Sequence, residues 1–199
     1  MAANDKIIKQ TNIAFGFLQK LYSEVAYLIK EIEGHLLNEN FVIGKPSGYG
    51  ITVRSSTGLE SNNVYLWLLR KLSVFFVDKE KTKTQRGQTR TEFTNNLKIL
   101  YIRIILNGGK EDIPTILYGI QYNIKKTNDK SKWPNYYEHL MGSFEYNENK
   151  VFQQFEGHYS DSYVEFDHKY KTLPLFELNN SEDVLEKIIE PLLGIYKRC

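Results

Sequence analysis

The chain of 199 residues is long enough to bury a hydrophobic core, and its 41% hydrophobic and 25% charged residues are ordinary for a globular protein. It contains no apolar run of roughly 18 residues and no signal-peptide centre, so we expect a cytoplasmic protein without membrane contact. The single cysteine, Cys199, excludes an intramolecular disulfide framework and a cysteine-based zinc site.

The net charge of +2 is distributed unevenly along the chain. Met1–Tyr137 carries 20 basic and 12 acidic residues, whereas Glu138–Cys199 carries 6 basic and 12 acidic residues. This asymmetry indicates either a partner of opposite charge or head-to-tail association of two copies of the chain.

The first predicted element is a long helix over Asp5–Asn38. Apolar residues recur every three or four positions from Ala14 to Leu36, and charged and polar residues occupy the opposite side. The width of this apolar stripe favours packing against a sheet. Its heptad spacing also permits pairing with a second helix.

A central β-hairpin is predicted next, from two strands rich in Ile, Leu and Tyr over Leu97–Leu106 and Thr115–Ile124. Strands so apolar must be covered, so we expect the other elements to pack on them. The remaining strand predictions are single strands at Leu72–Asp78 and Ser162–Tyr170 and hairpins within Phe41–Arg54 and Ser143–Phe155.

Near the C-terminus, Pro174 makes Leu173–Leu178 an expected edge segment. Asn180 or Ser181 caps a final helix that Pro191 should kink or split. We therefore expect one α+β domain over residues 1–199. It has a mainly antiparallel sheet of about five to seven strands, packed by the N-terminal and C-terminal helices.

The most unusual polar segment, Lys79–Thr91, lies between two apolar strands and is predicted to form a long hairpin tip. Its basic residues face only one acid, Glu80, and they are Lys79, Lys81, Lys83, Arg86 and Arg90. Such a tip can contact the phosphates of nucleic acid, with Thr and Gln adding hydrogen bonds, or an acidic protein. It can equally be a solvated loop without a partner.

A second candidate is the acidic stretch Glu156–Lys169. Within it, Asp167-His168-Lys169 has the D-x-K form found in Mg²⁺-dependent nucleases, and Glu165 should lie on the same strand face as Asp167 and Lys169. Alternating charge on an exposed strand explains the same residues.

Other catalytic motifs are absent from the sequence: no histidine pair has helical metal-site spacing, and neither a nucleophile elbow nor a dinucleotide loop is present. The sequence thus predicts no metal and no cofactor. It favours a non-catalytic binding or assembly protein that uses the basic tip. The alternatives are a Mg²⁺-dependent nuclease and a homo-oligomeric structural subunit.

Overall fold

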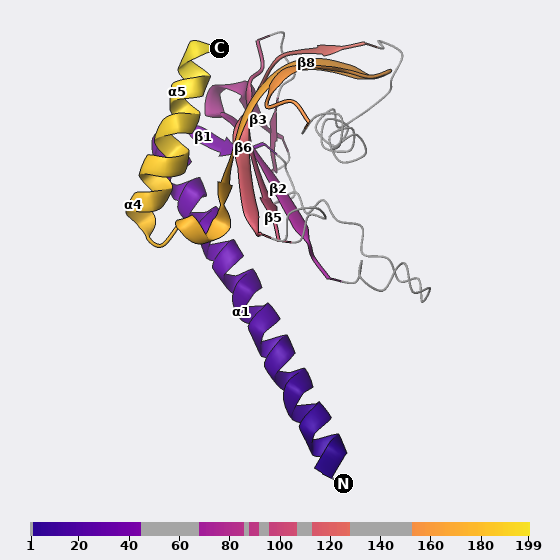
Figure 1. Cartoon of the computed structure of the whole chain (residues 1–199). Helices are drawn as coiled ribbons and strands as arrows, with labels where there is room; N and C mark the ends of the chain where they lie inside the picture. Colours follow the sequence, from indigo (N-terminus) through magenta and orange to yellow (C-terminus); the bar gives the residue numbers. More distant parts are fainter. Residues whose placement is uncertain (1, 45–67, 86–87, 92–95, 107–112, 128–152) are drawn as a thin grey trace.

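The computed structural model describes residues 2–44, 68–85, 88–91, 96–106, 113–127 and 153–199, and it shows the predicted α+β architecture (Figure 1). Within these residues, six antiparallel strands form one sheet in the order β1-β2-β5-β6-β8-β7. The strands are β1 (Phe41–Ile43), β2 (Lys71–Asp78), β5 (Ile99–Ile105), β6 (Thr115–Lys126), β7 (Glu156–Ser160) and β8 (Val164–Pro174).

The predicted central hairpin is confirmed as β5 and β6, which pair in register from Ile99↔Gln121 to Ile105↔Thr115. Both strands alternate buried residues between the two faces of the sheet, as their period of two requires. β6 continues to Lys126, past a bulge between Tyr122 and Lys125 where Asn123 adopts a positive φ of 52°.

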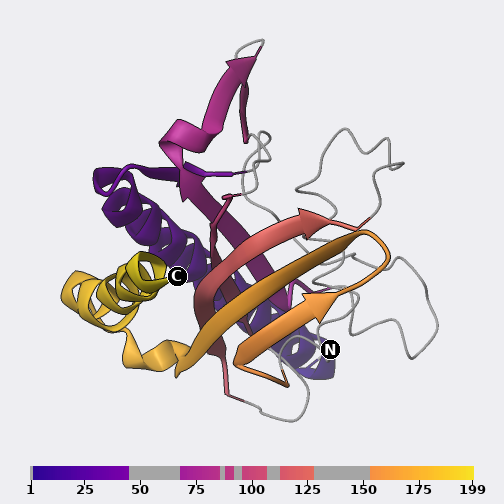
Figure 2. The same ribbon diagram turned by 90° about the horizontal axis from the view of Figure 1, so that it is seen from above.

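Both helices cover the same face of the sheet (Figure 2). The second half of α1 (Ala2–Asn38) and the C-terminal helical segments α4 (Ser181–Val184) and α5 (Glu190–Arg198) bury apolar side chains against it. Ile32 from α1 and Leu192 from α5 are fully buried there. The opposite face carries a second cluster, which comes mostly from the strands and includes the large buried side chains of Tyr101 and Phe166.

Helix α1 matches the prediction, but only its second half packs on the sheet. Val25, Ile29, Ile32 and Leu36 are buried, whereas every residue over positions 4–17 is exposed. The hydroxyl of Tyr22 donates to the carbonyl of Leu69, 3.1 Å away, close to where the helix joins the body. The first half projects from the body (Figure 1). At the rise of about 1.5 Å per residue of an α-helix, positions 4–17 span roughly 20 Å.

The C-terminal helix begins as predicted, because the Asn180 side chain accepts a hydrogen bond from the Asp183 amide. Pro191 also has the expected effect. A π-helical turn, Leu185–Ile189, separates α4 from α5, whose first turn contains Pro191. Proline has no N–H to continue the α-helical pattern, and a π-turn is one way to accommodate that loss.

The remaining strand predictions have mixed outcomes. Phe41–Ile43 is a strand, but it pairs with β2 in the register Phe41↔Asp78; its predicted partner lies outside the described residues. The hairpin predicted over Ser143–Phe155 is largely outside them too, and residues 153–155 form no strand. β8 extends to Pro174. Among the described strands, its last residues pair with β6 alone, because the pairing with β7 ends at Lys169, and Leu175–Glu177 forms a 3₁₀ turn.

None of the helices in the described part of the chain is long and apolar enough to cross a membrane.

Candidate functional site

The basic segment begins at the end of β2 with a capped turn. The Asp78 carboxylate accepts a hydrogen bond from the Glu80 amide at 2.9 Å, which caps the 3₁₀ turn Lys79–Lys81. The Lys79 amide donates to the carbonyl of Asn40 at 2.9 Å, and the Thr82 hydroxyl donates to the carbonyl of Lys79 at 2.7 Å. These bonds fix the direction in which the chain leaves the sheet.

Beyond the turn, β3 (Thr82–Gln85) and β4 (Gln88–Thr91) form a separate two-stranded sheet. This ribbon, the β3–β4 hairpin, extends away from the body of the molecule (Figure 2). The predicted hairpin tip is therefore confirmed as a backbone structure, while its function stays a prediction.

The register of the β3–β4 hairpin sorts its residue types by face. Lys83 pairs with Arg90 and Gln85 with Gln88, whereas Thr82 and Thr84 pair with threonines of β4. Because side chains alternate along a strand, both cations occupy positions on one face together with the two glutamines, and the other face holds only threonine positions. Of the other predicted cations, Lys79 is exposed, Lys81 is half-buried and Arg86 lies outside the described residues.

In the second candidate, the acidic strand, the charged side chains form separate ion pairs instead of a shared metal site. Each of its three charged residues pairs with a different neighbour: Glu165 with Lys125 at 3.0 Å, Lys169 with Glu156 at 2.7 Å, and Asp167 with His158 at 2.7 Å. The registers Glu156↔Lys169 and His158↔Asp167 place two of these contacts between β7 and β8, and the register Lys125↔Glu165 places the third between β6 and β8.

The Asp167 carboxylate also accepts a hydrogen bond of 2.7 Å from the Asn123 side chain. This bond, followed by the one to His158, lowers the pKa of Asp167 below its usual range. The hydrogen bond to Glu156 raises the pKa of Lys169, as expected for a lysine paired with a carboxylate. Both residues are therefore charged over the neutral pH range.

Asp161, another acid of the same stretch, caps its own turn by accepting hydrogen bonds from the Tyr163 and Val164 amides, both at 2.8 Å. Among the described residues, no three His, Cys, Asp or Glu side chains lie close enough to hold one metal ion. The row of charges on β7 and β8 can join the two strands. The hypothesis of a Mg²⁺-dependent nuclease that uses Glu165, Asp167 and Lys169 stays a prediction. The three side chains, each paired with a different neighbour, do not form a metal site.

A row of buried polar side chains lies on the sheet face opposite the helices. The sequence predicts the burial of only one of them, His168, because it shares a strand face with apolar residues. Four are at most 2% exposed: Ser73, Arg103, Gln121 and His168. The Ser73 and Tyr101 hydroxyls are 2.8 Å apart, and Arg103 Nη1 donates to the Tyr101 hydroxyl at 3.3 Å. Arg103 is the indication of this row in the sequence, because it is the one charged residue in the middle of an apolar strand.

Gln121 and His168 face each other across β6 and β8. Gln121 Nε2 donates to the Tyr170 hydroxyl at 3.2 Å, and the His168 ring stacks on the Tyr170 ring at 4.8 Å. Within the part of the chain that the structure describes, neither Gln121 Oε1 nor His168 Nδ1 has a hydrogen-bond partner. Burial lowers the pKa of His168, so its imidazole is neutral near pH 7. This row is a buried polar network.

Gly119 allows the Tyr170 ring to lie close to the sheet. It is the register partner of both Tyr101 and Tyr170. A Cβ atom at Gly119 would lie 2.0 Å from the Lys169 carbonyl oxygen and 2.7 Å from the Tyr170 ring. No side chain fits there, so glycine is a packing requirement of this face.

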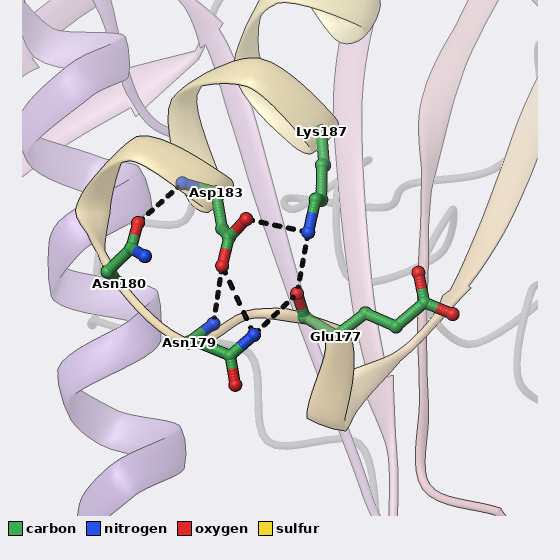
Figure 3. A network of polar contacts seen from close by, with 5 residues as sticks. All are labelled: Glu177, Asn179, Asn180, Asp183 and Lys187. Carbon is green, nitrogen blue, oxygen red and sulfur yellow. Dashed lines mark hydrogen bonds and ion pairs between the residues drawn. The ribbon is translucent and has the colours of Figure 1, made fainter.

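A polar cluster at the start of α4 has a structural explanation (Figure 3). Asp183 accepts from the Asn179 amide at 2.8 Å and forms an ion pair of 2.6 Å with Lys187, which also donates to the carbonyl of Glu177 at 2.9 Å. The hydrogen bond from Lys187 lowers the pKa of Asp183. These contacts hold the helix start against the segment that follows β8.

The chain matches no protein-family model, no curated protein and no solved structure. The described residues alone therefore carry the functional argument.

Proposed function

We propose that this protein is a non-catalytic nucleic-acid-binding protein whose β3–β4 hairpin contacts the phosphate backbone. The observation that carries the proposal is the register Lys83↔Arg90, which sets two cations directly opposite each other on an isolated ribbon. Like charges in directly opposed positions destabilise a strand pair, and a two-stranded hairpin is marginal by itself. A polyanion that lies across this face removes that repulsion.

The residues beside these cations suit the same partner. Glutamine and threonine hydrogen-bond to phosphate oxygens without reading sequence. A two-stranded ribbon also fits the major groove of duplex DNA, which is about 12 Å wide. Lys79 and Lys81, at the base of the hairpin, add positive charge where the ribbon meets the body. A cytoplasmic location, where nucleic acid is accessible, belongs to this proposal.

The test compares two variants with equal charge. Lys83→Gln combined with Arg90→Gln removes two cations from the ribbon, and Lys171→Gln combined with Lys197→Gln removes two exposed cations elsewhere. We expect the first variant to weaken binding to a 20-base-pair DNA and to lower the slope of log affinity against log salt by about 2. The second should change neither quantity. Fluorescence anisotropy at several salt concentrations measures both.

The proposal is contradicted if the wild-type protein does not bind single-stranded or duplex DNA or RNA, or if its binding does not depend on salt concentration. Binding of an acidic protein with no nucleic-acid affinity would assign the hairpin to a different class of partner.

A further inference from the structure

The projecting first half of α1 is more apolar than an isolated helix should be. Five large side chains on it are more than half exposed: Ile7 at 60%, Ile8 at 57%, Ile13 at 63%, Phe15 at 62% and Phe17 at 67%. Their positions fall on three sides of the helix. Exposed apolar side chains concentrated on one element mark an interaction surface more often than ones scattered singly over a protein. A helix apolar on so many sides is normally buried.

The second half of the same helix borders an open groove. The groove has a volume of about 380 Å³ and runs between α1 and the segment that joins β8 to α4. Tyr27, Leu28 and Phe176 supply apolar walls, and Tyr27 and Phe176 are 70% and 66% exposed. Glu24 and Glu31 also line it, so the groove is apolar with acidic margins.

The two halves of α1 carry opposite charge. Residues 2–20 contain Lys6, Lys9 and Lys20 against Asp5, a net charge of +2. Residues 21–38 contain Glu24, Glu31 and Glu33 against Lys30, a net charge of −2 with histidine neutral. Two such helices side by side bring unlike charges together only when they run antiparallel.

The spacing along α1 places the apolar side chains of the first half on the side that borders the groove in the second half. Ile13, Phe17, Glu24, Leu28 and Glu31 follow one another at intervals of four, seven, four and three residues, so they share one side of the helix. An antiparallel second copy therefore presents Ile13 and Phe17 to the apolar walls and its lysines to the acidic margins.

We propose that two copies of this chain form an antiparallel, two-fold dimer in which the projecting half of each α1 lies in the groove of the other copy. The contact is self-complementary, as a two-fold interface requires. The body of the chain is attached to the second half of α1 (Figure 1). In an antiparallel pair the two bodies therefore lie at opposite ends of the paired helices. This proposal does not depend on nucleic-acid binding by the hairpin.

Light scattering of the full chain at micromolar concentration tests the association. We expect twice the mass of one chain. Ile13→Glu or Phe17→Glu should raise the dimer dissociation constant at least about a hundredfold, because a carboxylate is then buried against apolar walls. Gln19→Glu, on the other side of the helix, is the matched control and should leave the mass unchanged. Circular dichroism confirms that each variant is folded.

Disulfide cross-linking tests the orientation. In a Cys199→Ser background, a mixture of Ile13→Cys and Tyr27→Cys chains should form a mixed disulfide dimer. Ile13→Cys alone should not cross-link, because antiparallel pairing separates the two copies of residue 13.

Three results would overturn the proposal. The first is a wild-type monomer at micromolar concentration. The second is a parallel pair, shown by self-cross-linking of Ile13→Cys. The third is a monomer that binds phosphatidylcholine–phosphatidylserine vesicles through residues 4–17, which would assign the apolar surface to a membrane.

Discussion

The stability of the folded protein depends on pH through Asp167 on the surface of β8. Its carboxylate accepts hydrogen bonds from Asn123 and His158, and these lower its pKa from the ordinary value near 3.8. A carboxyl group with a depressed pKa in the folded state stabilises that state at pH values above its unfolded pKa. The contribution disappears as the pH falls through the folded pKa.

We expect Asp167→Asn to reduce the free energy of unfolding at pH 7 by about 0.5–1 kcal/mol, since the pairs are partly exposed. The variant should also lose less stability than the wild type between about pH 5 and pH 2. Urea unfolding across that range measures both effects. Glu186→Gln is the control, because the Glu186 side chain forms no hydrogen bond or ion pair with the described residues. An unchanged acid profile in Asp167→Asn would contradict this account.

The row of buried polar side chains also affects how the core of the protein packs. Ser73, Arg103, Gln121 and His168 are sequestered on a face otherwise built from aromatic and aliphatic side chains. Hydrogen bonds to Tyr101 and Tyr170 satisfy part of this polarity. The hydrogen bonds that are present favour this arrangement of the core over others, because an unpaired polar group inside a protein is costly.

Helix α1 consists of two halves, of which the second packs on the sheet and the first does not. The second half gains stability from the sheet, whereas a free helix of the length of the first half is marginal in water. Gly34 lies in the supported half and Gly16 in the projecting half, and a Cβ atom added at either one meets nothing within 4 Å. The two glycines therefore form a matched pair of probes.

We expect Gly34→Ala to raise the global free energy of unfolding by about 0.5–1 kcal/mol, since alanine is the better helix former. Gly16→Ala should slow hydrogen exchange over residues 4–17 with little change in global stability. Both are measured in the Phe17→Glu background, so that dimer formation does not contribute. Equal effects on global stability would show that the projecting half unfolds together with the body.

The whole molecule is a sheet body with two projections, α1 and the β3–β4 hairpin. The hairpin forms its own two-stranded sheet, and its first and last residues, Thr82 and Thr91, are register partners. Removing it therefore leaves the hydrogen bonds within the six-stranded sheet intact.

Replacing residues 83–90 with Asn-Gly, a two-residue turn, should join Thr82 to Thr91 without strain. We expect the melting temperature to change by less than about 3 °C and DNA binding to be lost. Differential scanning calorimetry and anisotropy measure the two outcomes. A drop of about 10 °C would show that the hairpin stabilises the body.

The sequence by itself determined the elements whose signal is local. The period of α1, the apolar runs of β5 and β6, the Asn180 cap and the break at Pro191 each depend on residues within one or two turns or strands. The placement of the basic segment at a hairpin tip follows from the apolar strands on both sides of it.

Only the tertiary structure decided which segments meet. β1 pairs with β2, β8 inserts between β6 and β7, and the three charges of β8 bind three different neighbours. The apolar stripe of α1 continues beyond the end of its sheet, so half of it remains uncovered. These outcomes depend on contacts between residues far apart in the chain. No local pattern contains that information, because burial and pairing energies belong to both partners at once.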